Sequence, residues 1–260
     1  MDFADTLWLV GIGLEAILLA TLYLRGAWRK LPLFTIYCAW DFLNNSLLLV
    51  FSTAHNVRSE AFAIFFLATS VLDAVCILAV LTEIFWSVLR PLHATLPRHT
   101  ILILTVFLCM VAALLWPFTA IAGFGRLTSL TMHIQQVSSL LRIIVFALLA
   151  VSSHFLSLGW RDRELQVATG LGFYSLVSFG AMLVHTHSTS LSLYISLNEF
   201  VVASYLCSLL YWVYSFAQKE AERREFTPQM QNLLLAIAGV AREQRLALAQ
   251  AAAERSRSES

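Results

Sequence analysis

The chain has 260 residues, of which 59% are hydrophobic and 13% are charged, and its formal net charge is +1. Its mean hydropathy of +0.75 excludes an ordinary soluble domain, because such a domain would expose too much apolar surface to stay dispersed. The near-neutral charge, and a sequence without a basic patch among aromatic residues, exclude a nucleic-acid partner. Apolar runs that are continuous rather than alternating favour transmembrane α-helices over a β-barrel.

Seven apolar runs are each long enough to cross a bilayer as an α-helix, which takes about 20 residues. The runs are Leu7–Leu24, Pro32–Thr53, Ala61–Leu89, Ile101–Gly123, Ser129–Leu158, Glu164–His185 and Ser190–Ala217. The acidic start MDFADT lacks the positive region of a signal peptide, so we expect the first run to stay in the protein. We therefore predict an all-α, polytopic membrane domain over residues 1–218, with seven transmembrane helices in one bundle.

Lysine and arginine predict the orientation of this bundle. Basic residues gather in the segments after the first, third, fifth and seventh runs, whereas the opposite segments carry only Arg58 and Arg126. Segments rich in Lys and Arg stay in the cytoplasm. We therefore expect the N-terminus outside, the C-terminus inside, and a multi-pass protein of the cell's inner (plasma) membrane.

Ionisable residues within the apolar runs are the informative ones, because each costs about 2.5–3.5 kcal/mol at the centre of a transmembrane helix. Five such residues fall near one depth in five different runs: Glu15, Asp41, Asp73, Arg142 and Glu199. Polar neighbours at helical spacing extend them into stripes, as Asn44 and Asn45 do for Asp41. Such stripes must face the bundle interior, so these seven residues are our candidate site for a small ligand, an ion or a proton.

Charge within this layer is uneven, since Arg142 is the only cation among the five ionisable residues. Burial without a partner disfavours a charged carboxylate. We therefore expect some of the acids to be protonated and others to pair with Arg142 or with a bound cation. A hydrogen-bonded network that only fixes helix packing is the open alternative.

A second group of polar residues is expected near the outer surface. His133 and Gln136 stand near the start of the fifth run, and His185 and His187 stand near the end of the sixth. Histidines two positions apart point to different faces of a helix, so we expect no metal site here. A binding mouth, or pH-sensitive outer segments, is the better interpretation. The four cysteines all lie within the runs, without a CxxC pair, and indicate neither a disulfide nor a metal.

Residues 219–260 are predicted to form a cytoplasmic tail that carries one helix, at about 228–253. Thr227 is a suitable cap and Pro228 a suitable first residue for this helix. About three heptads follow, which favour docking to a cytoplasmic partner or self-association. The alternative is an amphipathic helix on the inner leaflet, with Arg242 and Arg245 against anionic lipid.

Covalent retinal, which some seven-helix membrane proteins carry, is excluded by the positions of the lysines. Retinal needs a Schiff-base lysine in the last run, but the lysines are Lys30 and Lys219, both at the ends of runs. Glu199 lies in the last run instead. We therefore expect no cofactor.

Three short segments resemble a group of uncharacterised bacterial seven-helix integral membrane proteins. They are EIFWSVLRP from Glu83 to Pro91, SSLLR ending at Arg142, and LSLGWR ending at Arg161. The resemblance covers most of the membrane domain and implies the same seven-helix topology. It implies no activity, so it transfers no functional residue.

Three functions are compatible with these patterns. The leading hypothesis is a sensor or receptor-like module that binds a small ligand, ion or proton in the polar layer and signals through the tail helix to a separate partner. A small ion- or proton-coupled transporter is the alternative, because several acids lie at mid-depth. A structural scaffold without a ligand is the third. We expect no enzyme, because the sequence has no nucleophile–base pair at usable spacing.

Overall fold

The computed structural model describes residues 3–53, 59–88, 99–119, 126–153, 162–187 and 191–218. Within these ranges the chain is helical and has no β-strand, which confirms the all-α class. The α-helices are α1 Phe3–Leu24, α2 Pro32–Thr53, α3 Ser59–Val88, α4 Thr100–Leu115, α5 Arg126–Ser153, α6 Arg163–His187 and α7 Leu191–Ala217. Two 3₁₀ helices, η1 Ala27–Arg29 and η3 Trp116–Thr119, complete the described elements. The predicted tail helix lies outside the described residues.

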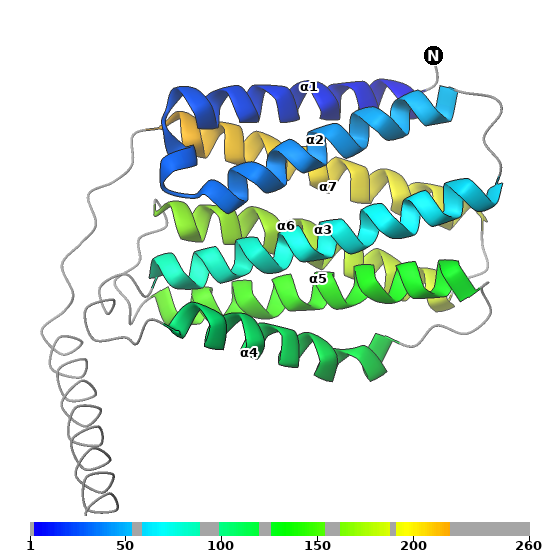
Figure 1. Cartoon of the computed structure of the whole chain (residues 1–260). Helices are drawn as coiled ribbons and strands as arrows, with labels where there is room; N and C mark the ends of the chain where they lie inside the picture. Colours follow the sequence, from blue (N-terminus) through cyan, green and yellow to red (C-terminus); the bar gives the residue numbers. More distant parts are fainter. Residues whose placement is uncertain are drawn as a thin grey trace, which may run out of the picture.

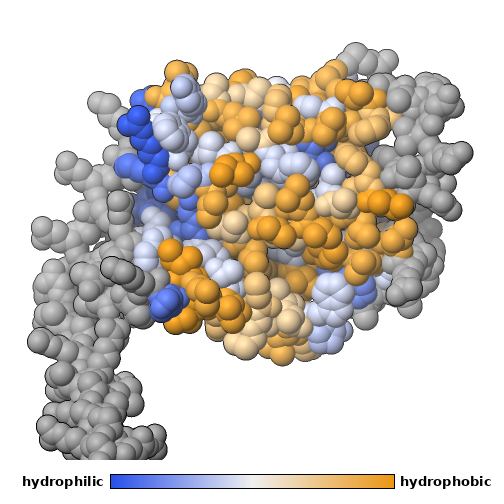
Figure 2. Space-filling view, viewed as in Figure 1, coloured by the Kyte–Doolittle hydropathy of each residue, from blue (hydrophilic) through white to orange (hydrophobic). Residues whose placement is uncertain are grey.

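All seven α-helices are long and apolar enough to cross a membrane, as the seven apolar runs predict. On the face seen in Figure 2, apolar side chains cover the middle of the bundle, and hydrophilic residues gather at the end where α1 joins α2. Helix α4 is shorter than predicted, because it ends at Leu115 and continues as η3 instead of reaching Gly123. Pro117 explains this early end, since proline cannot donate a backbone hydrogen bond to the preceding turn.

Six of the helices form a closed ring, and α4 lies outside it. Around the ring, α1 packs on α2, α2 on α3, α3 on α5, α5 on α6, α6 on α7 and α7 on α1. Helix α4 packs on α3, α5 and η3. Successive helices run in opposite directions, so that α3 and α5 are parallel neighbours (Figure 1). The ring encloses the interior in which the candidate site lies.

Two glycines allow α6 to lie very close to its neighbours. A Cβ atom on Gly170 would lie 2.3 Å from Nε1 of Trp212 in α7, and one on Gly172 would lie 2.4 Å from Cγ of Phe146 in α5. The indole Nε1 of Trp212 donates a hydrogen bond to the Gln166 carbonyl oxygen at 3.2 Å. Small residues at such contacts are typical of helix packing in membranes.

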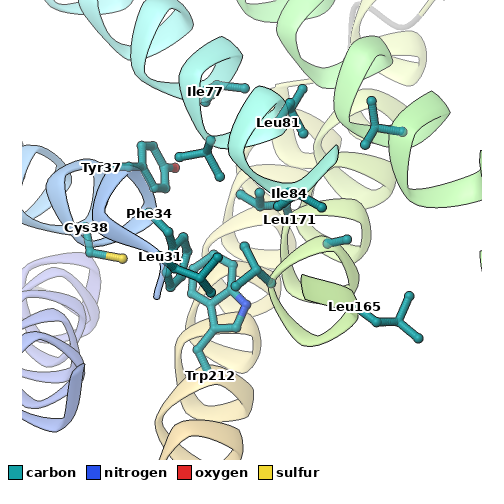
Figure 3. Close-up of a cluster of buried hydrophobic side chains, with 14 of the residues drawn as sticks. Leu31, Phe34, Tyr37, Cys38, Ile77, Leu81, Ile84, Leu165, Leu171 and Trp212 are labelled. Atoms are coloured by element: carbon teal, nitrogen blue, oxygen red, sulfur yellow. The ribbon is translucent and has the colours of Figure 1, made fainter. Parts of the chain in front are cut away.

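The half of the ring nearer the α1–α2 connection is filled by apolar side chains, which we call the apolar core. Every ring helix contributes to it, including Leu18, Phe34, Ile77, Leu149, Leu165 and Trp212. The ring of Phe34 lies 5.3 Å from that of Trp212, edge to face, and 5.7 Å from that of Phe216, stacked. Figure 3 shows Phe34 and Trp212 among buried side chains of α2, α3, α6 and α7. The apolar core closes this half of the bundle.

Charged groups next to the apolar core are paired with backbone at helix ends. The Glu83 carboxylate in α3 accepts the backbone N–H groups of Leu33, at 2.9 Å, and Phe34, at 2.8 Å, in the first turn of α2. Pro32 begins that turn, as proline often does. A carboxylate at a helix N-terminus satisfies free N–H groups and complements the helix dipole. Glu83 therefore has a structural role, as a cap that joins α3 to α2.

Arginines bond to backbone in the same way at the C-terminal end of α7. Arg163 Nη1 donates to the Ser215 carbonyl oxygen at 2.6 Å, and its Nη2 donates to that of Gln218 at 2.7 Å. Arg25 Nη2 donates to the Ala217 carbonyl oxygen at 2.6 Å. Cations at a helix C-terminus satisfy carbonyls that have no partner within the helix. The last turn of α7 is therefore held by α6 and by the end of α1.

Candidate functional site

A polar cavity of about 260 Å³ lies inside the ring, directly next to the apolar core. Five helices line it, namely α2, α3, α5, α6 and α7. Its lining residues are Tyr37, Asp41, Asn44, Asn45, Phe66, Thr69, Ser70, Asp73, Gln135, Ser139, Arg142, Tyr174, Ser178 and Tyr205. All of these except Phe66 have polar side chains. A hollow of this composition inside an apolar bundle is the best candidate for a binding site.

The cavity and the core meet along every helix that lines the cavity. Asp73 is followed four residues later by the buried Ile77, and Tyr205 is followed four residues later by the buried Leu209. Residues four apart lie on one face of a helix. The same inward-facing stripe thus changes from polar to apolar within about one turn, and this change sets the floor of the cavity.

The structure brings together most of the candidate residues that the sequence predicts. Asp41, Asn44, Asn45, Asp73 and Arg142 line the one cavity. Four further polar residues, at helical spacing from Asp73 or Arg142, also line it: Thr69, Ser70, Gln135 and Ser139. The structure thus places these residues around one space inside the bundle, and their role in binding stays a prediction.

Glu15 and Glu199 lie elsewhere. Glu15 is joined to the cavity wall, because Asn45 Nδ2 donates to its Oε1 at 2.6 Å. Glu199 is exposed and lines a separate α1–α7 groove of about 310 Å³. Asn45 and Tyr205 line both the cavity and this groove, and Glu15 lines the groove. These side chains separate the two hollows.

Arg142 supplies a buried positive charge to the cavity, and its side chain is 6% exposed. Its Nε donates to the Ser138 carbonyl oxygen at 3.3 Å, and its Nη2 to Ser139 Oγ at 3.4 Å. Its guanidinium carbon lies 5.6 Å from the centre of the Tyr174 ring. Among the described residues, both of its hydrogen-bond acceptors belong to α5 itself. Since a guanidinium has five N–H donors, Arg142 retains donors for a bound group.

The acids of the cavity are bonded unequally. Asp41 Oδ2 lies 2.7 Å from the Tyr205 hydroxyl, which also contacts Glu15. Asp73, by contrast, takes no hydrogen bond from another described residue. Glu15 Oε2 and Asn44 Oδ1 are buried without a hydrogen-bond partner within the described ranges. A buried polar atom without a partner costs about 1–3 kcal/mol of stability. These atoms could therefore accept hydrogen bonds from a bound molecule.

Of the four residues expected near the outer surface, His133 and Gln136 do not line this cavity. His133 Nδ1 lies 3.0 Å from Thr119 Oγ1, and its ring stacks on Trp116 at 5.4 Å. Gln136 is buried and is not among the lining residues. His133 therefore holds η3 against α5. His185 and His187 end α6, and their side chains lie outside the described residues.

A metal site is not evident in the described part of the chain. No group of three or more His, Cys, Asp or Glu residues there could hold a metal ion. The cysteines Cys38, Cys76, Cys109 and Cys207 are free thiols. The polar groups that line the cavity are hydroxyls, carboxyl groups, amides and the guanidinium of Arg142.

Three tyrosines of the cavity were missed by sequence reasoning, because an aromatic residue in an apolar run is usually part of the core. They are Tyr37, Tyr174 and Tyr205. A signal was present for two of them. Tyr37 precedes Asp41 by four residues, and Tyr174 precedes Ser178 by four, so each pair lies on one helix face.

Comparisons of the chain with protein-family models, with curated proteins and with solved structures find no match. The resemblance to bacterial seven-helix membrane proteins stays a prediction. Of the residues that carry it, Glu83 caps α2, Arg142 lines the cavity, and Arg161 lies outside the described residues.

Proposed function

We propose that this protein is a seven-helix membrane sensor, a receptor-like module that binds a small polar ligand in the cavity and signals through its tail to a separate protein. One observation carries the proposal. Arg142 and Asp73, of opposite charge, line one cavity from neighbouring helices, and neither hydrogen-bonds to the other. Opposite charges that do not neutralise each other directly fit a ligand with both an acidic group and a hydrogen-bond donor.

The size of the cavity limits this ligand. About 260 Å³ is below the usual range for drug-sized molecules, so the ligand is a small metabolite or a hydrated ion. Polar groups surround the space on five helices. A ligand bound there would contact all five helices. If these contacts differ between two arrangements of the helices, binding shifts the equilibrium between them, as a sensor requires.

Helix α7 supports the signalling part of the proposal. It carries Tyr205 in the cavity wall and ends at Ala217, next to the tail. At about 1.5 Å per residue, some 20 Å of continuous helix separate the cavity from the first tail residue. Arg25 and Arg163 fix its last turn. A shift of α7 at Tyr205 would therefore reach the tail, whose heptad pattern favours docking to a partner.

The proposed orientation follows from the basic residues at this end of the bundle. Arg25, Arg29 and Lys30 lie in the connection between α1 and α2, at the same end as the end of α7. Positive residues stay on the cytoplasmic side. We therefore place the N-terminus outside, and the tail in the cytoplasm at the plasma membrane.

A thermal-shift screen tests the binding proposal. The full chain in lipid nanodiscs is exposed to a panel of amino acids, small carboxylates, amines, Na⁺ and K⁺. We expect at least one compound to raise the unfolding temperature of the wild type but not of Arg142→Gln. Arg29→Gln is the matched control, since Arg29 is exposed and contacts Trp28. A ligand that stabilises Arg142→Gln as well as the wild type would contradict the proposal.

The signalling part has its own test. A chain without residues 219–260 is compared with the full chain for ligand affinity and for crosslinked cytoplasmic partners. We expect the affinity to be unchanged and the crosslinks to be lost. If every crosslinked partner and downstream response survives the deletion, the sensor hypothesis is wrong.

An ion- or proton-coupled transporter is the second candidate, and the α1–α7 groove favours it. The groove and the cavity share Asn45 and Tyr205, so only a thin polar wall divides two hollows. Flux into proteoliposomes that falls with Asp41→Asn or Glu199→Gln would favour transport over sensing. Unchanged flux in both variants would remove this candidate.

A further inference from the structure

Three oxygen atoms from three helices meet at the wall between the cavity and the α1–α7 groove. The Tyr205 hydroxyl of α7 lies within hydrogen-bond distance of Glu15 Oε1 in α1 and of Asp41 Oδ2 in α2. A tyrosine hydroxyl has a single proton and can donate only one hydrogen bond. The other contact would bring two oxygen lone pairs together unless a carboxyl group supplied a second proton. The arrangement therefore requires two protons among the three groups: the hydroxyl proton of Tyr205 and one proton on a carboxyl group.

The position of Glu15 indicates which carboxyl group holds this proton. Glu15 is 2% exposed, and its Oε2 is buried without a hydrogen-bond partner among the described residues. A buried carboxylate with a bare oxygen is far more costly than a neutral carboxyl group. The side chain of Asp41, by contrast, is partly exposed to the cavity, which Arg142 also lines and where its positive charge favours a carboxylate.

We propose that Glu15, Tyr205 and Asp41 form a proton-binding site, with the proton resident on Glu15 and exchangeable with Asp41. In the resident state Glu15 donates to the Tyr205 oxygen, and Tyr205 donates to Asp41. In the exchange, the Glu15 O–H bond breaks and its proton joins the Tyr205 oxygen, while the Tyr205 proton moves to Asp41 Oδ2. Glu15 becomes a carboxylate, Asp41 becomes neutral, and Tyr205 stays neutral. The net charge of the three groups is unchanged, and no electron is transferred.

This exchange moves a proton from the groove side of the wall to the cavity side. Glu15 lines the groove, and Asp41 lines the cavity. The site would thus join the two hollows for protons without opening the wall to larger solutes. It does not depend on the ligand proposed above, because its atoms contact one another directly.

The other titratable groups around the site come from each neighbouring helix. They are Tyr37 and Cys38 of α2, Asp73 of α3, Arg142 of α5, Tyr174 of α6 and Glu199 of α7. Asp73 opposes a negative charge on Asp41, and Arg142 favours it. Glu199 lines the groove together with Glu15.

Infrared spectroscopy of the full chain in nanodiscs, at neutral pH and without added ligand, tests this site. A protonated carboxyl group has a C=O stretch that shifts in D₂O and is distinct from carboxylate bands. We expect the wild type to show this band, Glu15→Gln to lose it, and Asp41→Asn to keep it at a shifted frequency. Glu199→Gln is the matched control and should leave it unchanged, because Glu199 lies in the groove and is exposed.

The remaining outcomes overturn the proposal. They are a wild type without the band, a band that persists in Glu15→Gln, and a band lost in Asp41→Asn. If Glu15→Gln does not fold, as judged by gel filtration, the proposal is tested with Tyr205→Phe instead. We expect that variant to shift the band to higher frequency, because the hydrogen bond from Glu15 is lost, and an unshifted band would overturn the proposal. Since no ligand is added, these results are independent of the binding screen with Arg142→Gln.

Discussion

The apolar core and the polar cavity are built from the same ring of helices, yet they treat polar groups in opposite ways. Beside the core, Glu83 accepts hydrogen bonds from backbone groups at the start of α2, and Arg163 donates hydrogen bonds to backbone groups at the end of α7. In the cavity, Arg142 bonds only within its own helix among the described residues, and Asn44 Oδ1 is unpartnered. A charge that is bonded to the end of another helix has a role in folding. A charge that is not so bonded is a candidate for the proposed binding site.

This difference also indicates how the bundle tolerates its interior charges. Buried unsatisfied groups reduce stability, and the core next to them supplies the packing that compensates. We therefore expect substitutions in the two halves to have opposite signatures. Changes in the core should lower the free energy of unfolding, and changes in the cavity should affect binding.

The largest effect is expected from Phe34→Ala in the core. Phe34 is fully buried between Trp212 and Phe216, and removal of such a ring costs about 3–5 kcal/mol. The measurement is the free energy of unfolding in detergent. Phe118→Ala is the control, because Phe118 is 78% exposed and its loss should leave stability nearly unchanged. Equal effects of the two substitutions would show that the core does not stabilise the bundle.

A smaller loss is expected from Glu83→Gln. The amide retains one acceptor oxygen but loses the charge and one of the two hydrogen bonds to α2, which is worth about 1.5–3 kcal/mol. Unfolding should be easier, while the affinity for any ligand found in the screen should be unchanged. A loss of affinity with intact stability would show that Glu83 contributes to binding. It would contradict the proposed division between core and cavity.

The close approach of α6 and α7 can be tested with Gly170→Ala. The new methyl group would collide with the Trp212 indole, and overpacking of this kind costs about 1–3 kcal/mol. Gly13→Ala is the matched control, because nothing lies within 4 Å of a Cβ at Gly13. That control should be neutral or slightly stabilising by thermal unfolding, since alanine favours a helix. Similar unfolding temperatures for both variants would contradict the close packing.

The smallest effect on stability is expected from Asp73→Asn. Asp73 accepts no hydrogen bond from a described residue, so the change breaks none and should alter stability by less than about 1 kcal/mol. Ligand affinity should nevertheless fall about 10- to 100-fold, which calorimetry can measure. A strongly destabilised variant with normal affinity would assign Asp73 to packing and would favour the scaffold hypothesis.

The sequence predicts some parts of this site well and others poorly, for physical reasons. Apolar run length predicts the helices, and the four-residue spacing of Asp41 and Asn45 predicts a shared inward face. Depth alone does not predict direction. Glu199 and Tyr205 are both in α7, but at 100° per residue they point about 120° apart, so that only Tyr205 lines the cavity.

The sequence also does not predict which helices contact one another. The position of α4 outside the ring depends on which faces pack, and its uniformly apolar sequence does not indicate a face. The role of His133 depends on Thr119, which η3 brings beside it only because Pro117 ends α4. The sequence around His133 does not indicate whether its side chain bonds to another helix or lines a binding mouth.

Helix α4 also has a consequence for how the charges come to face each other. Asp73 and Arg142 lie near the middle of α3 and α5, which are parallel neighbours. A chain that crosses a membrane twice in the same direction must return between the two crossings. Helix α4 is that return, made on the outside, where it displaces nothing from the ring. It contributes no residue to the cavity, yet without this crossing α5 would run the other way.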